Sequence, residues 1–273
     1  MQTGKALRAL KRPGRVARAL CARVPIPGLR RYCVICERHA SAFLPFRRGL
    51  KDCSPLMLAL EVVGGDPVNC ACPWCGCTDR DRHLLLYLRA TGLIESFRGS
   101  RILHLAPEAH LPAILERENP ELYVRTDLMK GLTIDLQSDL TCLPFEDGSF
   151  DIFIANHVLE HVLDLSTCLR EIARVLAPGG FAVLQTPYSP VLTRTFRDPA
   201  ITTESMRFHA YGQEDHERLF GSDIFRLIAE HGFKADIRHH DSELQGTDAK
   251  EMGVNVREPL FLFWKQDQPS PPS

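Results

Sequence analysis

The chain has 273 residues, of which 44% are hydrophobic, and its 33 basic and 34 acidic residues nearly cancel to a formal net charge of -1. This length and composition predict a soluble globular protein of about two domains. No apolar run approaches the roughly 20 residues that a membrane-spanning helix needs, and the N-terminal region lacks the hydrophobic segment of a secretory signal. We therefore expect a cytoplasmic protein, in which clustered cysteines bind metal rather than form disulfides.

Residues 1–31 are strongly basic, with nine of the 33 Lys and Arg residues and no acid. Such an arm can neutralise the phosphates of RNA or lie on an anionic membrane surface. The interpretation we favour is a solvated, flexible leader, because prolines and glycines interrupt any long helix here: Pro13, Gly14, Pro25, Pro27 and Gly28.

Two C-x-x-C pairs, Cys33 with Cys36 and Cys72 with Cys75, predict a zinc site. Four thiolates complete a tetrahedral site and leave no open position for chemistry, so this zinc would be structural. Free buried cysteines would not account for two such pairs. Further thiols are present at Cys53, Cys70 and Cys77, and Cys70 or Cys77 could replace one of the four. We expect residues 32–99 to form a zinc-ribbon module with a docking helix.

The docking helix is predicted over Thr78 to Ala90, where a T-x-x-D start precedes a leucine-rich stripe and Gly92 marks the end. Its first turn carries Arg80, Arg82 and His83. These side chains could face a substrate, but an exposed charged turn on a surface helix is the interpretation we favour.

The main domain begins with predicted strands at residues 101–107 and 122–128, and a third over 150–155 is almost continuously apolar, as in a buried parallel strand. Polar residues follow that strand directly, namely Asn156, His157, Glu160 and His161. Open α/β sheets place their ligands at this edge. Apolar residues then repeat at helical spacing from Leu165, and Pro178-Gly179-Gly180 is expected to end that helix before the next strand.

The run from Asp147 to Pro187 contains D-G-S-F-D, N-H-V-L-E-H-V and E-I-A-R-V-L-A-P-G-G without a gap. It resembles class I methyltransferases that use S-adenosylmethionine. The segment C-P-W-C-G, with R-D-R after it, resembles a subgroup that carries an N-terminal zinc module, which extends the resemblance over most of residues 32–240. The resemblance implies an α/β fold with a Rossmann-like seven-stranded class I methyltransferase sheet over residues 100–267, its last strand antiparallel, and an N-terminal zinc ribbon. The tail 268–273 should be disordered.

The first loop departs from the wider family, since residues 102–130 contain no glycine. His104, Ala106, Pro107 and Glu108 stand where most members have a glycine-rich loop, and the subgroup has the same H-x-A-P-E pattern. S-adenosylmethionine has no phosphate to bind through such glycines. The resemblance further places the ribose at Asp127, the adenine near Asp139 and Leu140, and Asn156 beside the cofactor. The alternative for each aspartate is a helix or turn cap.

Three histidines are candidate general bases. His157 and His161 lie one helical turn apart and can face one cleft, while His216, in the segment Y-G-Q-E-D-H-E-R, can close it from the other side. The alternatives are that His161 only packs against its neighbours or caps a helix, and that His157 only lines the cleft with a polar side chain. Methyl transfer depends mainly on alignment, so we expect no catalytic triad. Residues 188–207 show no strand pattern and suit a lid.

Three functions are compatible with these patterns. The first is methyl transfer to an O or N atom of a small molecule or glycan, the second is methylation of RNA through the zinc module and basic arm, and the third is a binding protein without catalysis. The sequence leaves the acceptor atom and the oligomeric state open.

Overall fold

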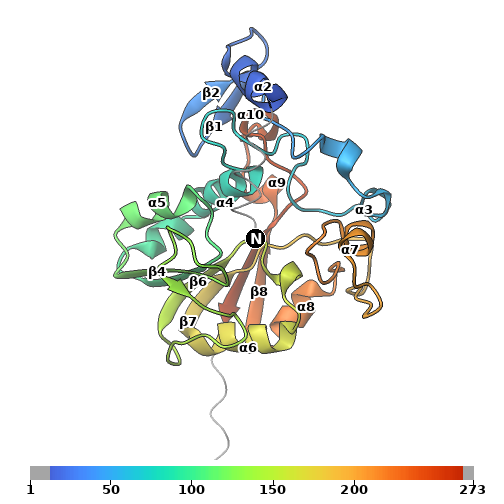
Figure 1. The fold of residues 1–273 in the computed structure, drawn as a ribbon. Coiled ribbons are helices and arrows are strands. Elements are labelled where there is room, and N and C mark those ends of the chain that lie inside the picture. Colours follow the sequence, from blue (N-terminus) through green and yellow to red (C-terminus); the bar gives the residue numbers. More distant parts are fainter. Residues whose placement is uncertain (1–12, 267–273) are drawn as a thin grey trace, which may run out of the picture.

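The computed structural model describes residues 13–266, in which an N-terminal module sits on one edge of a large α/β domain (Figure 1). Residues 1–12 of the predicted basic arm and the predicted disordered tail 268–273 lie outside the described residues. Within the described part, no helix has the length and apolar character needed to cross a membrane.

A seven-stranded sheet forms the centre of the larger domain, in the order β5-β4-β3-β6-β7-β9-β8. The strands β3 to β7 are parallel, and β9 runs antiparallel to both of its neighbours. The expected seven strands and antiparallel last strand are thus present. Their bounds are β3 Arg101–Leu105, β4 Leu122–Asp127, β5 Leu136–Gln137, β6 Phe150–Ala155, β7 Leu176–Val183, β8 Phe233–Arg238 and β9 Leu260–Lys265.

Helices cover both faces of this sheet, which is why its central strands are apolar throughout. On one face Ile102, Ile154 and Leu260 share a core with the leucines of α4, and on the other Leu103, Phe153 and Phe261 share a core with α6 and α8. The helices are α4 Asp79–Ala90 and α5 Leu111–Leu115 on the first face, and α6 Leu165–Val175 and α8 Ile224–Ala229 on the second.

The Pro178-Gly179-Gly180 turn lies inside β7, not between a helix and a strand as predicted. Helix α6 ends at Val175 and β7 starts at the next residue, with a register irregularity opposite Phe150 and Ile152. A Cβ atom on Gly180 would lie 2.7 Å from the carbonyl oxygen of Asp151. The glycines therefore allow a bulged strand to start without a loop.

The N-terminal module contains a two-stranded sheet and a helix: β1 Arg31–Cys33, β2 Arg38–Ala40 and α2 Pro13–Arg23. An 11-residue helix, α2, lies within the region for which the sequence favoured a flexible leader. It is described from Pro13, a residue that is tolerated in the first turn of a helix, and it ends at Arg23, before Pro25. Arg23 donates to the carbonyl of Pro73 at 3.0 Å, and the Ser41 amide donates to Ala22 at 2.9 Å. Residues 13–23 are thus attached to the module.

The same module also contacts the predicted lid region, residues 188–207, and the helix that follows from it. Helix α3 contacts α7, and the amide of Val63 donates to the carbonyl of Tyr188 at 2.8 Å. The predicted lid region contains no strand longer than single bridges. The remaining elements are η1 Gly49–Asp52, α3 Pro55–Ala59, η2 Leu93–Phe97, η3 Glu116–Glu118, η4 Leu159–His161, α7 Glu204–Tyr211, α9 His240–Glu243 and α10 Ala249–Met252.

Candidate active site

Three neighbouring strands end at one level at the carboxyl edge of the sheet. Leu105 in β3 pairs with Thr126 in β4 and with Ala155 in β6. The next residues, Ala106, Asp127 and Asn156, therefore lie side by side. Ala106 has a φ of 47° and His157 a φ of 57°, in the left-handed region that non-glycine residues seldom adopt. Such backbone strain concentrates at functional sites.

The first loop is organised by a buried contact between His104 and Glu108. His104 is fully buried, with Nδ1 2.6 Å from the hydroxyl of Tyr123 and Nε2 3.1 Å from Glu108 Oε2. Asn156 Nδ2 donates to Glu108 Oε1 at 2.5 Å. Burial opposes ionisation of Glu108, but the contact with His104 outweighs it and holds the pKa of Glu108 below its ordinary value. His104, which is fully buried, thus positions Glu108.

One buried acceptor oxygen beside this loop, Asn156 Oδ1, has no hydrogen-bond partner among the described residues. Glu108 Oε2, next to it, lies 3.1 Å from His104 Nε2 and accepts no other hydrogen bond from those residues. A buried acceptor without a donor is costly, so such atoms indicate a ligand that donates. An ammonium group, such as that of an amino acid, fits this requirement. Pro107 lies half-buried in the same turn.

Asp127 and Asp139 both cap turns of their own. Asp127 Oδ1 accepts from the amide of Met129 at 3.0 Å, and Asp139 Oδ1 accepts from the amide of Thr141 at 2.8 Å. Asp127 pairs with Gln137, the last residue of β5, and Asp139 follows two residues after the end of that strand. Asp139 is exposed and Leu140 is buried. Because each carboxylate has a second oxygen, the capping role leaves room for a ligand contact.

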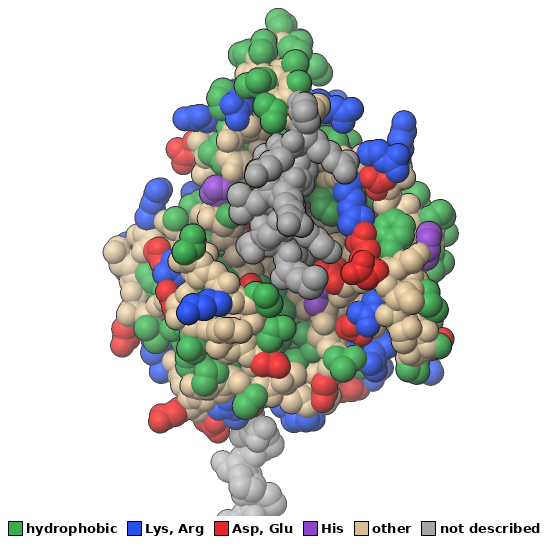
Figure 2. All heavy atoms as spheres, in the orientation of Figure 1, with side chains coloured by type: hydrophobic (Ala, Val, Ile, Leu, Met, Phe, Trp, Pro, Cys, Tyr) green, Lys and Arg blue, Asp and Glu red, His purple; other side chains and the backbone are tan. Residues whose placement is uncertain are grey.

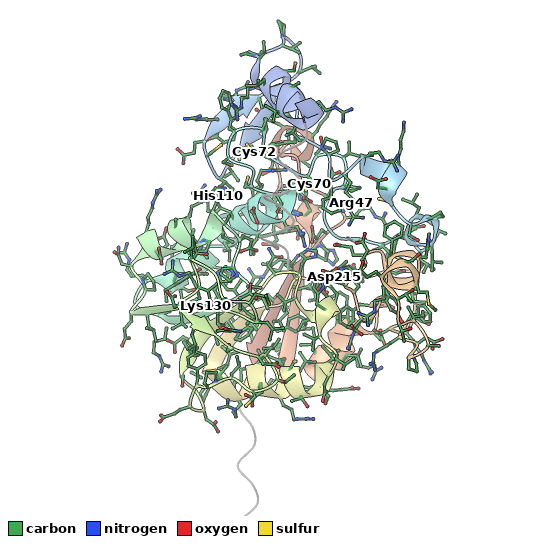
Figure 3. The ribbon with its side chains drawn as sticks, in the orientation of Figure 1. Arg47, Cys70, Cys72, His110, Lys130 and Asp215 are labelled. Carbon is green, nitrogen blue, oxygen red and sulfur yellow. The ribbon has the colours of Figure 1, made fainter. Side chains whose placement is uncertain are left out.

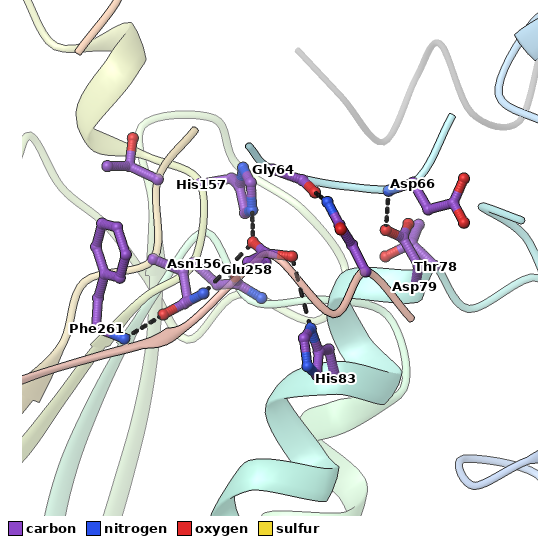
Figure 4. Close-up of polar contacts among 12 residues, drawn as sticks. Gly64, Asp66, Thr78, Asp79, His83, Asn156, His157, Glu258 and Phe261 are labelled. Carbon is purple, nitrogen blue, oxygen red and sulfur yellow. Dashed lines mark hydrogen bonds and ion pairs between the residues drawn. The ribbon is translucent and has the colours of Figure 1, made fainter. Parts of the chain in front are cut away.

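A chain of buried side chains runs from this edge into the docking helix (Figure 4). His157 Nδ1 lies 3.3 Å from Glu160, and His157 Nε2 lies 3.2 Å from Glu258. Glu258 Oε2 lies 3.7 Å from His83 Nδ1, and His83 Nε2 lies 3.1 Å from His240 Nδ1. Burial and the charge of Arg80 lower the pKa of His157, but its contacts with Glu160 and Glu258 raise it above the ordinary value. His157 is therefore held between two carboxylates, a poor position for a base.

The charged first turn of α4 is buried, which contradicts the exposed surface helix that the sequence favoured. Arg82 is 0% exposed, and Asp79, Asp81 and His83 are at most 3% exposed. The predicted cap is present, with reciprocal bonds between Thr78 and Asp81. Burial raises the pKa of Asp79 to about 6 and that of Asp81 to about 7.

Sequence reasoning passed over His83 and missed Glu258. The density of charge in the first turn of a leucine-rich helix was the available signal for His83. Glu258 gave none, because it stands alone before an apolar strand.

His161 and His216 lie together next to Glu160. Their rings are 4.8 Å apart between centroids and nearly perpendicular. His161 Nδ1 lies 3.1 Å from the carbonyl oxygen of Asp215, which Figure 3 labels, and His216 Nδ1 lies 2.9 Å from that of Tyr211. Burial lowers the pKa of His216. A group of acidic side chains lies on the same face beside α7 (Figure 2).

A cluster of thiols lies between the β1–β2 sheet and α4, at the position of Cys72 in Figure 3. Its members are Cys33, Cys36, Cys72, Cys75 and Cys77. The Sγ atoms of Cys33 and Cys75 are 3.9 Å apart, and those of Cys36 and Cys72 are 3.8 Å apart. Tetrahedral zinc with bonds of about 2.3 Å holds its sulfurs about 3.8 Å apart. The four thiols that all lie within 4.8 Å of one another are, however, Cys33, Cys72, Cys75 and Cys77. The structure thus brings Cys77 into competition with Cys36 for one position.

The thiol cluster touches the first loop directly. His110 Nε2 lies 2.7 Å from the carbonyl oxygen of Cys75.

A surface hollow of about 480 Å³ lies away from the candidate site, between residues 66–69 and 249–256. None of the predicted site residues lines it.

The sequence of residues 112–184 matches a family model described as "Methyltransferase domain". The chain is 33% identical over 109 residues to an uncharacterized 37.1 kDa protein in transposon TN4556 of Streptomyces fradiae, covering 40% of this chain and 31% of that protein. It is 42% identical over 69 residues to the 2-phytyl-1,4-naphtoquinone methyltransferase of Synechococcus elongatus, covering 24% of this chain and 30% of that enzyme. The chain thus spans about a third of the length of these two relatives.

Among solved structures, a 1,6-didemethyltoxoflavin-N1-methyltransferase from Burkholderia thailandensis, with 1,6-didemethyltoxoflavin and S-adenosylhomocysteine bound, aligns with a TM-score of 0.48 at 14% identity. The alignment covers 67% of this chain and 79% of that one. The family model thus matches about a quarter of the chain, from α5 to the end of β7, and the strand order of the sheet agrees with the seven strands and antiparallel last strand that the resemblance implied.

Proposed function

We propose that this protein transfers a methyl group from S-adenosylmethionine to an O or N atom of a small molecule or glycan. The observation that carries the proposal is the buried acceptor Asn156 Oδ1, which has no hydrogen-bond partner among the described residues and lies beside the carboxylate of Glu108, at the level where β4 ends in Asp127. The ammonium group of the cofactor's methionine part would supply the donor that Asn156 Oδ1 lacks and a positive charge next to Glu108. The family match over residues 112–184 supports the same assignment.

The residues that would hold the cofactor come from four loops. The turn at Ala106 and Pro107 would lie against the methionine part of the cofactor, and Glu108 and Asn156 would accept hydrogen bonds from its ammonium group. Asp127 would accept from both ribose hydroxyls, and Asp139 with Leu140 would border the adenine. When bound, S-adenosylmethionine supplies an electrophilic methyl group on a sulfonium.

The chain's own task is then to align the acceptor and exclude water. The segment 211–218 and helix α3 border the acceptor side, where α3 contacts α7. Of the three predicted bases, His161 and His216 have a ring nitrogen without a partner, whereas His157 is occupied on both sides. Acceptor contact is therefore assigned to His161 and His216.

We further propose a structural zinc ion in the thiol cluster. Cys33, Cys72 and Cys75 would be ligands, with Cys36 or Cys77 as the fourth. A site with four thiolates is closed, so this ion would take no part in methyl transfer. Through His110 it would instead fix the first loop.

Calorimetric titration with S-adenosylmethionine tests the cofactor site. Replacing Asp127 with Ala removes two hydrogen bonds to a charged acceptor, worth on the order of 2 to 4 kcal/mol together, so the affinity should fall well over tenfold. Asp241→Ala, an exposed aspartate in α9, is the matched control and should bind as the wild type does. An unchanged dissociation constant for Asp127→Ala would place the cofactor elsewhere.

Turnover assays then separate the three functions. Methyl transfer to small acceptors supports the proposal, and hydroxylated aromatic rings are the first panel, because a relative is named for a naphthoquinone. Salt-sensitive binding and methylation of RNA would favour an RNA substrate. Tight cofactor binding without transfer to any acceptor class would favour a binding protein.

A further inference from the structure

We propose that Glu160, His161 and His216 form a second metal site, which binds a divalent transition-metal ion on the acceptor side of the cleft. One nitrogen of each ring and one carboxylate oxygen lie within 4.8 Å of one another. The metal site itself depends only on these residues. Its role in acceptor binding rests on the proposed methyltransferase function.

The hydrogen bonds of both histidines fix which nitrogen is free. A carbonyl oxygen only accepts, so His161 Nδ1 must carry the proton that it donates to Asp215, and His216 Nδ1 the proton donated to Tyr211. Each neutral ring therefore presents an unprotonated Nε2. Metal-binding histidines are commonly oriented in this way, with the other ring nitrogen donating to a backbone carbonyl.

Both of these Nε2 atoms are buried and have no hydrogen-bond partner among residues 13–266. His216 as a whole is only 3% exposed. A buried lone pair without a donor is costly, and two of them facing one carboxylate need a shared cation or an ordered water. With ligand bonds of about 2.1 Å, three such atoms lie about 3 to 4 Å apart, so small side-chain rotations close the site.

Backbone contacts hold the two segments of the site together. The amide of Glu217 donates to the carbonyl of Glu160 at 2.8 Å, and Arg218 donates to the carbonyls of Val162 and Leu163. Thr186 donates to Glu160 Oε2 at 2.8 Å and orients the carboxylate. The segment 211–218 is thus fixed beside η4 without the metal, and the ligand set is largely preformed.

The donor set itself favours a cation. Glu160 supplies a carboxylate oxygen, and the carboxylate of Asp215 lies 3.8 Å from His161 Nδ1. Two imidazoles and one carboxylate suit Zn²⁺, Fe²⁺, Mn²⁺ or Co²⁺ and not Ca²⁺ or Mg²⁺, which prefer oxygen ligands.

Three protein ligands leave coordination positions open, in contrast to the thiol cluster. An acceptor with a hydroxyl or carbonyl oxygen can occupy such a position, which would align it at the cleft and lower the pKa of a hydroxyl. The site therefore favours oxygen-bearing acceptors among the proposed small molecules.

The test is metal content after loading with Co²⁺ and gel filtration, measured without any cofactor. Wild type should hold two ions per chain and show two sets of absorption bands, one from cobalt–thiolate charge transfer and weaker ones from a site of nitrogen and oxygen ligands. His161→Gln should lose the second ion and only the weaker bands. Glu160→Gln, which has the same shape as the native residue, should do the same.

His209→Ala, at an exposed histidine of α7, is the control and should hold two ions. His161 is partly exposed, so its replacement should fold, and circular dichroism checks this. One ion per chain in wild type, or two in folded His161→Gln, overturns the proposal. Loss of the second ion with unchanged S-adenosylmethionine affinity supports the metal site. A second ion in a protein that binds no S-adenosylmethionine would leave the metal site standing and reject the methyltransferase function.

Discussion

The core of the N-terminal module is small and contains Cys33, Phe43, Cys72 and Cys77. The two cores of the sheet together contain dozens of buried side chains, most of them aliphatic or aromatic. At about 25 cal/mol per Å² of buried apolar area, the sheet has ample hydrophobic stabilisation and the module has little. The difference shows that the module needs another source of stability. Thiolate–metal bonds are one source, and polar contacts at its junction with the sheet are the other.

The junction is organised by Arg82, a buried arginine whose guanidinium bonds to backbone carbonyls. Its guanidinium donates to the carbonyls of Asn69 and Gly253 at 2.7 Å and to that of Met252 at 2.9 Å. It also lies 3.8 Å from the centroid of the Phe43 ring. One side chain thus connects the module, α4 and the segment after α10.

The largest expected effect is loss of the thiol cluster. A structural zinc contributes roughly 10 to 16 kcal/mol to the folding of small zinc domains, so Cys72→Ser or a strong chelator should unfold the module. Hydrogen exchange should rise over residues 31–77 while β6 and β7 stay protected, because the sheet has its own core. Cys142→Ser, at an exposed cysteine, is the control.

The same measurement identifies the fourth ligand. Zinc content should fall in Cys36→Ser or in Cys77→Ser, and the variant that keeps its zinc names the residue that is not a ligand. Unfolding of the whole chain on zinc removal would contradict the separation of the two regions.

A smaller effect is expected at the junction. Arg82→Met leaves several buried carbonyls without a donor and should lower the free energy of unfolding by about 3 to 5 kcal/mol. Urea denaturation followed by circular dichroism measures this loss. Arg89→Met, at an exposed position on the same helix, should change stability by less than about 0.5 kcal/mol. If the two substitutions lowered the free energy of unfolding equally, Arg82 would contribute no more to stability than an exposed arginine.

In the sheet domain, the corresponding loss comes from apolar packing. Leu169 in α6 is fully buried, so Leu169→Ala should cost about 2 to 5 kcal/mol, through lost apolar burial and the cavity left behind. Leu163→Ala, at a 64% exposed leucine, is the control. The loss for Leu169→Ala should be the same with and without chelator. A loss that depends on zinc would show that the two regions fold as one unit.

The smallest effect concerns the pair of Arg101 and Asp151 at the start of β3 and β6. The hydrogen bond from Arg101 holds the pKa of Asp151 below its ordinary value. The pair therefore contributes its full stabilisation above about pH 4, where an aspartate of the unfolded chain is ionised. That contribution is lost as the pH falls through the lower pKa that Asp151 has in the folded protein. Since the side chain is 37% exposed, solvent screening limits the effect to less than about 1 kcal/mol. Urea midpoints of wild type and Asp151→Asn should converge as the pH falls below the range in which an unfolded aspartate titrates, and a difference that does not change with pH would contradict the pairing.

The sequence by itself determined the central strands β3, β4, β6 and β7, the crossover through α6, the capped start of α4 and the presence of a thiol cluster. Each of these follows from patterns within a short stretch, since hydrophobic period, capping residues and C-x-x-C spacing act between near neighbours. Only the tertiary structure decided which side chains meet across long separations. It buried the first turn of α4 against Glu258, brought Cys77 beside Cys33, and set His216 next to His161. No local pattern encodes these partners, because they depend on how separately formed elements dock, and the same docking turned His157 from a candidate base into a residue held between two carboxylates.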